Sequence, residues 1–445
     1  MSNSNQWNIG EKDSTSVTAT FKGDHLIIKG KGDIRTNYYF KRGAKEWTNA
    51  TKTIKKVTLK RGITGIGYGV FNDCDSLVSV SIPNTVTRIG DSSFAGCDNL
   101  TTLKIPNSVI QIDGTAFASC ENLTSINIPE NLTTIAPLSY AQTGILNITI
   151  PSKVTVIGRE AFAWCNNLDK IVIPKNVIKI EEGAFKACSS LSHIQLSNGL
   201  QIIGKEAFAK CNKMQKIFIP ASVVDIDFSA FYYCDNFTEI IVDTENAKYS
   251  SIDGVLYNKA RDTLLIVPSG QKGRFVVPNH VTHIGRSAFE RCSELTEIQI
   301  PENVTSVGRG AFFRCGSLKE VIIPNAVDSI EANTFWYCTS LQSVVLPKNL
   351  AKIGSSAFLN CYNLTSIVIP KKVSSIDFAT FRDCQSLVSI NNLSEIPQDI
   401  SNSAFEKVNL KRIKLYVPAN SVSAYQNAKI WQDFGEILPL RQDEK

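Results

Sequence analysis

Long apolar runs, blocks of like charge and signal sequences are lacking in this 445-residue chain. No stretch approaches the roughly 18 consecutive apolar residues of a membrane-spanning helix, so we expect no transmembrane segment. The net charge of +6 is spread thinly and includes no lysine and arginine run, which argues against nucleic acid as a partner. The chain opens with the polar MSNSNQW. Either the protein is intracellular, or an export signal has been removed together with any lipid anchor it carried.

Motifs that carry catalysis are also lacking. The four histidines include an H-x-x-H pair, His280 and His283, with no glutamate at the metalloprotease spacing. No G-x-S-x-G, glycine-rich phosphate loop or paired acidic motif occurs. We therefore predict that the protein is not an enzyme and has no cofactor or metal.

Twelve cysteines are present, and nearly every interval between them is 23 residues. No C-x-x-C occurs, which argues against zinc. Neighbouring strands would bring equivalent cysteines near enough for a disulfide, but their side chains would point the same way rather than face each other. The interpretation that we favour is a small buried side chain that fills the same pocket in every repeat.

Each repeat has one pattern of apolar positions. The copy at Cys315 reads Leu318, Val321, Ile323, Pro324, Val327, Ile330, Glu331, Phe335 and Cys338. L-x-x-I-x-I-P alternates like a strand that ends at proline, and V-x-x-I predicts a second extended edge. A following x-x-A-F-x-x-C, after a Gly, Asp or Glu, suggests about one helical turn. Such units bury apolar side chains only against neighbouring repeats, which makes a solenoid.

The 23-residue F-x-x-C-x-x-L-x-x-I-x-I-P-x-x-V-x-x-I-G pattern resembles the BspA-like leucine-rich repeat family, also called the Treponema pallidum type, over roughly residues 54–418. Segments 250–270 and 416–434 are similar to a variant repeat and to the C-terminal ending of such proteins in Bacteroidetes. The resemblance implies a leucine-rich repeat solenoid, a β-rich α/β right-handed superhelix with about fourteen rungs. It also implies an extracellular or bacterial cell-surface protein, with adhesion among the roles of some members.

The ends differ from the repeats and predict caps. Residues 1–50 should form a β-hairpin cap, with strands at 17–21 and 26–30 and aromatic cover from Trp7, Tyr38, Tyr39, Phe40 and Trp47. Residues 51–420 form the solenoid, with a hairpin-like insertion near 243–273 that projects or replaces a helical turn. Residues 421–445 form a cap in which Ser421 starts a short helix and Trp431 and Phe434 close the last rung.

Two columns of variable residues should line the exposed sheet, five and seven residues past each cysteine. The first runs from hydroxyl to basic to acidic to hydroxyl: Ser79, Thr102, Ser125, Lys170, His193, Lys216, Glu239, Glu297, Glu320, Ser343, Ser366 and Ser389. The second contains apolar residues: Val172, Phe218, Ile241, Ile322, Val345 and Val368.

Exposed apolar residues in three consecutive rungs are typical of a partner site, although β-branched residues also simply suit strands. Aromatic residues beside the cysteines, on a ridge next to this column, extend the surface. The candidate binding residues are Phe218, Ile241, Ile322, Val345, Val368, Phe313, Trp336 and Tyr337. We expect a monomer that binds a host protein, a glycan or another microbe. The alternatives are a cell-surface spacer without a ligand and an enzyme accessory or inhibitor domain.

Overall fold

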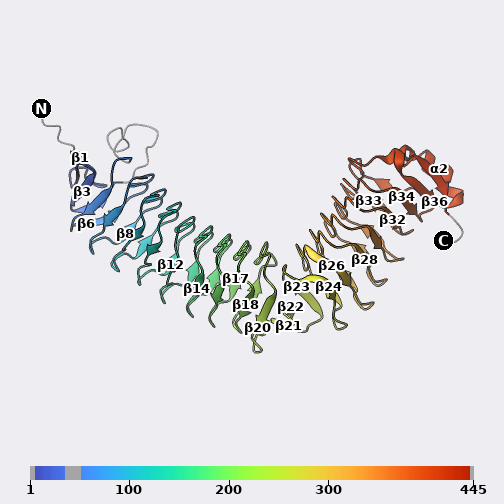
Figure 1. Cartoon of the computed structure of the whole chain (residues 1–445), viewed down its shortest axis with the longest axis horizontal. Helices are drawn as coiled ribbons and strands as arrows, with labels where there is room; N and C mark the ends of the chain where they lie inside the picture. Colours follow the sequence, from blue (N-terminus) through green and yellow to red (C-terminus); the bar gives the residue numbers. More distant parts are fainter. Residues whose placement is uncertain (1–5, 36–51, 441–445) are drawn as a thin grey trace. The chain divides into compact units, whose positions relative to one another are not determined.

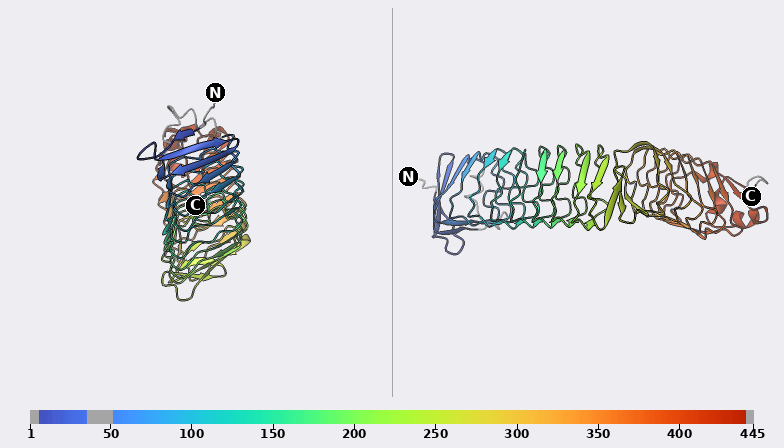
Figure 2. Two further views of the ribbon diagram at one scale, coloured as in Figure 1. Left: turned by 90° about the vertical axis from the view of Figure 1, so that its left-hand side faces the viewer. Right: turned by 90° about the horizontal axis from the view of Figure 1, so that it is seen from below.

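The computed structural model describes residues 6–35 and 52–440, which divide into two compact units, residues 1–234 and 235–445. Each unit is a stack of rungs, and a rung contributes one short strand to each of two parallel rows (Figures 1 and 2). Within the described ranges, no helix has the length and apolar character needed to cross a membrane. Tyr38, Tyr39, Phe40 and Trp47, predicted to help cover the first rung, lie outside the described residues.

The first strand row is formed by the predicted I-x-I-P segments, whose alternate side chains are buried and exposed. In the first unit these strands are β5 (Lys56–Leu59), β7 (Ser79–Ser81), β9 (Thr102–Leu103), β11 (Ser125–Ile126), β14 (Lys170–Val172), β16 (His193–Gln195) and β18 (Lys216–Ile219). In the second unit they are β20 (Glu239–Val242), β24 (Lys272–Val276), β26 (Glu294–Gln299), β28 (Glu320–Ile322), β30 (Ser343–Val345), β32 (Ser366–Ile369), β34 (Ser389–Asn392), β36 (Lys414–Val417) and β37 (Glu436–Pro439).

The second strand row confirms the extended edge predicted for the V-x-x-I segments. In the first unit it consists of β6 (Ile63–Ile66), β8 (Arg88–Ile89), β10 (Gln111–Ile112), β12 (Thr134–Ile135), β13 (Val156–Ile157), β15 (Lys179–Ile180), β17 (Ile202–Ile203) and β19 (Asp225–Ile226). In the second unit it consists of β23 (Thr263–Ile266), β25 (His283–Ile284), β27 (Ser306–Val307), β29 (Ser329–Ile330), β31 (Lys352–Ile353), β33 (Ser375–Ile376) and β35 (Asp399–Ile400).

The helical turn predicted for x-x-A-F-x-x-C is wrong. The segment forms linked turns in which two residues have positive φ, such as Asn333 at 65° and Tyr337 at 61°. Its amides pair with the next rung instead of continuing a helix: the Phe335 amide donates to the Ala357 carbonyl at 2.8 Å. Apolar residues three apart suit one helical turn, but here rung-to-rung hydrogen bonds satisfy the backbone.

The core of each rung is built around a phenylalanine and a cysteine. The phenylalanine rings stack from rung to rung, with centroids 5.2–5.4 Å apart from Phe289 to Phe405. Most cysteine thiols lie beside this stack and donate to the carbonyl of the preceding rung's phenylalanine, for example from Cys338 to Phe312 at 3.1 Å. Cys165 donates to the Tyr140 carbonyl, and Cys292 lies 3.7 Å from the Val267 carbonyl. The favoured interpretation of the cysteines as small buried side chains agrees with the structure, which adds a hydrogen-bonding role. Cysteine supplies both the small volume and the donor that this position requires.

One rung departs from this pattern. Tyr140 replaces phenylalanine in the stack, and Thr143 takes the cysteine position and donates to the Tyr140 carbonyl at 2.8 Å. Gly144 follows, and a Cβ on it would clash with the Glu121 carbonyl. This rung is one residue short, and its first-row segment forms only an isolated bridge between Asn147 and Lys170 instead of a strand.

The first unit begins with the predicted hairpin. β2 (Val17–Lys22) and β3 (His25–Gly30) pair antiparallel, and β1 (Gln6–Asn8), which contains Trp7, pairs with β2. β3 then pairs in parallel with β5, so the hairpin joins the first strand row, and the following β4 (Gly32–Ile34) pairs in parallel with β6 of the second row.

The insertion in the second unit forms part of the core. β21 (Tyr249–Ile252), β22 (Val255–Asn258) and β23 form an antiparallel meander, and β23 pairs in parallel with β25. The predicted hairpin is present, but it neither projects nor replaces a helical turn, because it supplies a second-row strand. Val255, Tyr257 and Leu264 are buried, and burial raises the pKa of Tyr257 to about 12.

The C-terminal segment packs against the last rung. It contains η1 (Leu410–Arg412), η2 (Ala419–Ser421), α2 (Val422–Gln426) and η3 (Trp431–Asp433). Trp431 and Phe434 both pack edge-on against Phe405, and the Trp431 indole donates to the Gln398 carbonyl at 3.0 Å. Ser421 precedes α2 as predicted, but its side chain does not cap the helix: the hydroxyl donates to the Glu395 carbonyl at 2.7 Å and accepts from no helix amide.

Candidate ligand-binding surface

An apolar stripe, defined as Ile322, Val345 and Val368, lies on β28, β30 and β32. The three side chains are 62%, 56% and 45% exposed. Ile322 and Val345 are direct partners in the parallel ladder, so their side chains lie side by side. The preceding residue on each strand is buried. Because successive side chains of a strand point to opposite faces, the three residues of the stripe point to the solvent.

The rest of the predicted column is less continuous. Ile241 in the second unit is 36% exposed, whereas Phe218, 45% exposed, belongs to the first unit. Val276, 54% exposed, joins the column, because β24 places it opposite Gln299. The sequence holds a signal for it: Val276 precedes Pro278 by two residues, as Ile322 precedes Pro324. Gln299 then interrupts the column and accepts from Arg274 at 2.6 Å.

Hydroxyl and acidic side chains flank the stripe. Glu320 and Ser343 are ladder partners, and Ser366 occupies the same place on β32. All three are exposed. On β26, Glu297 pairs with Arg274 at 3.1 Å. The surface therefore combines an apolar centre with a polar edge, which is the usual composition of a protein-binding patch.

The aromatic ridge, defined as Phe313, Trp336 and Tyr337, lies in the turns that precede the strands. The Phe313 and Trp336 rings are 4.7 Å apart, and those of Trp336 and Tyr337 are 6.0 Å apart. The Arg314 guanidinium lies 5.3 Å from the Phe313 ring and 5.1 Å from the Tyr337 ring. These side chains are only partly exposed because they cover one another and Arg314 already contacts two of the rings. The stripe is the more open apolar surface.

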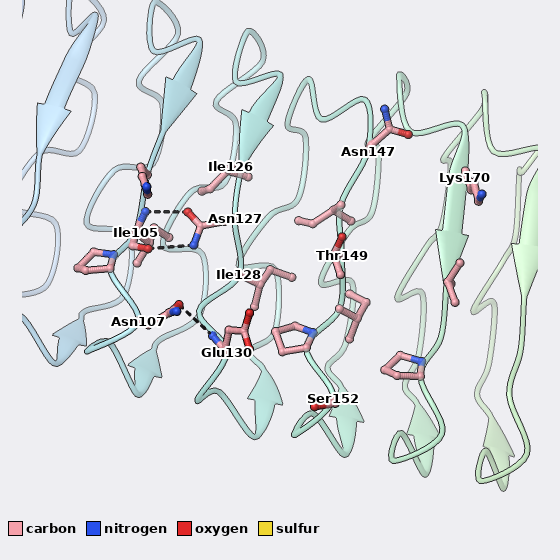
Figure 3. Close-up of a pocket in the computed structure, with 17 residues that line it drawn as sticks. Ile105, Asn107, Ile126, Asn127, Ile128, Glu130, Asn147, Thr149, Ser152 and Lys170 are labelled. Carbon is pink, nitrogen blue, oxygen red and sulfur yellow. Dashed lines mark hydrogen bonds between the residues drawn. The ribbon is translucent and has the colours of Figure 1, made fainter. Parts of the chain in front are cut away.

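A groove of about 1020 Å³ opens in the first unit at the irregular rung (Figure 3). The Asn127 side chain forms two hydrogen bonds with the neighbouring rung, accepting from the Ile105 amide at 2.8 Å and donating to the Ile105 carbonyl at 2.9 Å. The Asn127 side chain thus bonds to the Ile105 backbone where a strand-to-strand backbone hydrogen bond would otherwise form. The rung that follows is the irregular one, which lacks its first-row strand. Exposed polar residues line the groove: Lys104, Asn107, Asn127, Glu130, Asn147, Thr149, Ser152 and Lys170.

The histidine pair His280 and His283 does not form a metal site. The His280 ring lies 5.7 Å from that of Tyr257, and His283 Nδ1 is 2.7 Å from the Thr282 hydroxyl. Across the described ranges, no three His, Cys, Asp or Glu side chains come together to hold a metal ion.

Comparison with known families agrees with the repeat geometry. The sequence model described as the BspA type leucine rich repeat region matches residues 43–169, 155–258, 272–388 and 352–428. The chain belongs to the BspA-type leucine-rich repeat family. The buried cysteines and the stacked phenylalanine rings described above are thus features of this BspA-type solenoid. A search of curated proteins finds no significant match.

Solved structures of bacterial proteins resemble this BspA-type chain along most of its length. The pneumococcal vaccine antigen PcpA is 18% identical with a TM-score of 0.59, covering 96% of this chain and 97% of its own. A leucine-rich repeat protein from Bacteroides ovatus is 23% identical with a TM-score of 0.55, covering 96% and 98%. A leucine rich cell surface protein from Faecalibacterium prausnitzii is 25% identical with a TM-score of 0.50, covering 87% and 94%.

Proposed function

We propose that this protein is a non-enzymatic binding protein of the bacterial cell surface or extracellular space, and that the apolar stripe contacts its partner. The exposed Ile322, Val345 and Val368 on consecutive first-row strands carry the proposal. Contiguous apolar side chains that face water commonly mark interaction sites. Membership in the BspA-type family and likeness to a leucine rich cell surface protein support the location.

The solenoid suits partner binding because the apolar stripe lies on hydrogen-bonded parallel strands. Val321, Val344 and Ile367 anchor the same strands in the core, so a partner meets side chains on a rigid backbone. A standard interface covers about 800 Å² per partner, more than three side chains supply. The partner would therefore also cover the hydroxyl groups of Ser343 and Ser366, with the stripe as the apolar centre.

The test is a binding screen of the purified chain against extracellular matrix proteins, mucins and glycans. The variant Ile322→Glu/Val345→Glu/Val368→Glu places three charges on the stripe, and we expect saturable binding to be lost while the fold is intact. The matched control Phe378→Glu/Val388→Glu/Ile396→Glu charges three exposed apolar residues outside the stripe and should bind normally.

The outcomes separate the candidate functions. Binding that survives the stripe variant would move the site away from the stripe, with Trp336→Ala and Tyr337→Ala as the next variants. Absence of saturable binding across the panel would favour the alternative, a structural spacer at the cell surface. Copurification with an enzyme would instead favour the accessory or inhibitor role.

A further inference from the structure

We propose a second binding site, in the first unit, for an acidic polysaccharide. It consists of a basic column, defined as Lys170, His193 and Lys216, and the adjoining groove. The column lies on the first strand row, and all three side chains are exposed. It shares no residue with the apolar stripe, so the proposal is independent of the function proposed above.

The basic side chains are stacked at strand spacing. Lys170 and His193 are direct partners in the parallel ladder of β14 and β16, and Lys216 holds the same place on β18 in the next rung. Paired strands lie about 4.8 Å apart, so the column presents one nitrogen-bearing side chain per strand spacing. Lys170 and Lys216 carry like charge two strand spacings apart, and a polyanion laid across the rungs would be attracted to both.

Some other lysines of the first unit have acidic partners. Lys186 pairs with Glu206 at 2.6 Å, and Lys205 pairs with Glu182 at 3.0 Å. In the described part of the chain, Lys170 and Lys216 form no ion pair. The carboxylate beside Lys170 in the sequence, Asp169, accepts from the Ser192 hydroxyl at 2.5 Å. The same Ser192 hydroxyl lies 2.7 Å from His193 Nδ1. The ammonium groups of Lys170 and Lys216 are therefore the charges available to a negatively charged ligand.

The groove continues from the column, because Lys170 and Val172 belong to its lining. At about 1020 Å³ it is at the upper end of the volumes found for small-ligand sites. Figure 3 shows Asn147 and Lys170 near one end and Ser152 near the other. Amide and hydroxyl groups of this kind suit the many hydroxyl groups of a sugar chain, each of which both donates and accepts a hydrogen bond.

The spacing favours a polysaccharide over an acidic peptide. In an extended peptide, side chains on the same face are about 6.7 Å apart, which does not match a column with a repeat of about 4.8 Å. One sugar unit of an extended linear chain has a length close to the strand spacing. The shared chemistry is a linear sugar chain with carboxylate or sulfate groups, and Val172 and Phe218 flank the column for its apolar ring faces.

The experiment measures binding of the full chain to polygalacturonate, which carries carboxylates, and to heparin, which carries sulfates. Neutral dextran and poly-glutamate are the comparison ligands. We expect at least one acidic polysaccharide to bind, more weakly as salt increases. Lys170→Gln/His193→Gln/Lys216→Gln should weaken binding about tenfold or more, since it removes both lysine charges and the imidazole of the column. Thr149→Glu, an exposed groove substitution, should also weaken it.

Two controls separate this site from net charge and from the stripe. Lys371→Gln/Lys372→Gln removes exposed positive charge in the second unit and should bind normally. The stripe variant should also retain polysaccharide binding. The proposal is overturned if neither acidic polysaccharide binds, if poly-glutamate binds as tightly as they do, or if the column variant binds like the unmodified chain. Loss in the stripe variant as well would assign both ligands to one site and would overturn it too.

Discussion

The phenyl stack makes a prediction that can be worked from the structure. Phe335 is fully buried, and its ring stacks between those of Phe312 and Phe358 at centroid distances of 5.3 and 5.4 Å. Phe335→Leu keeps an apolar side chain at this position but removes both ring pairs. Phe335→Ala removes the ring pairs and leaves a cavity as well.

The expected costs follow from the ring pairs and the buried volume that each substitution removes. Aromatic pairs contribute about 0.5–1.5 kcal/mol each beyond their buried area, so Phe335→Leu should lower the free energy of unfolding by about 1–3 kcal/mol. Phe335→Ala should lower it by about 3–5 kcal/mol. Because a solenoid is stabilised by packing between neighbouring rungs, one interior substitution weakens two interfaces.

Urea denaturation followed by tryptophan fluorescence, together with Tm, would measure both variants. The matched control is Phe378→Leu, because Phe378 is 59% exposed and should change stability by no more than about 0.5 kcal/mol. If Phe335→Leu were as stable as the unmodified chain, the stack would only fill volume, and the argument from ring pairing would be refuted.

Two other features give direct predictions. Burial raises the pKa of the thiols of Cys188, Cys211, Cys315 and Cys361, so a thiol reagent at pH 8 should react slowly with the folded chain and rapidly with all twelve cysteines in denaturant. These raised pKa values keep the thiols protonated in the folded chain, whereas thiols of the unfolded chain ionise near pH 8.5. The free energy of unfolding should therefore keep the full contribution of these thiols below about pH 8 and decrease above it. A Tm that rises from pH 8 to 10 would contradict this. Ser421→Ala should cost about 1 kcal/mol through the lost bond to Glu395, and Ser421→Asp should cost more, because a carboxylate cannot donate to that carbonyl. If the Asp variant matched the unmodified chain in urea denaturation, Ser421 would be acting as a helix cap instead.

The sequence predicted the two rows of parallel strands well because the apolar pattern that produces them recurs in every repeat. Alternation places Val321 inward and Ile322 outward, and proline ends the strand, so two rows of parallel strands follow from one repeat. The turn segment was predicted wrongly for the opposite reason. A spacing of three between apolar residues suits a helical turn, while the pairing of the Phe335 amide with the next rung depends on a neighbour far along the chain.

Parts of the candidate sites also lay beyond local reasoning. Val276 was missed because its rung has no cysteine to count from, although its place before Pro278 matches that of Ile322 before Pro324. Arg314 was found between Phe313 and Tyr337 only through proximity in space. The groove arises because one short rung fails to form a strand and Asn127 bonds to the Ile105 backbone in the neighbouring rung. No single repeat encodes such an opening.

The sequence by itself determined the repeat, the inward and outward positions of each first-row strand, and the family, because stacked rungs repeat one local pattern. The tertiary structure alone decided how the backbone of each turn is satisfied, that most thiols bond to a carbonyl of the rung before them, and where the regular surface opens. Those features depend on hydrogen bonds and packing between residues about one repeat apart, and such interactions exist only once neighbouring rungs have stacked.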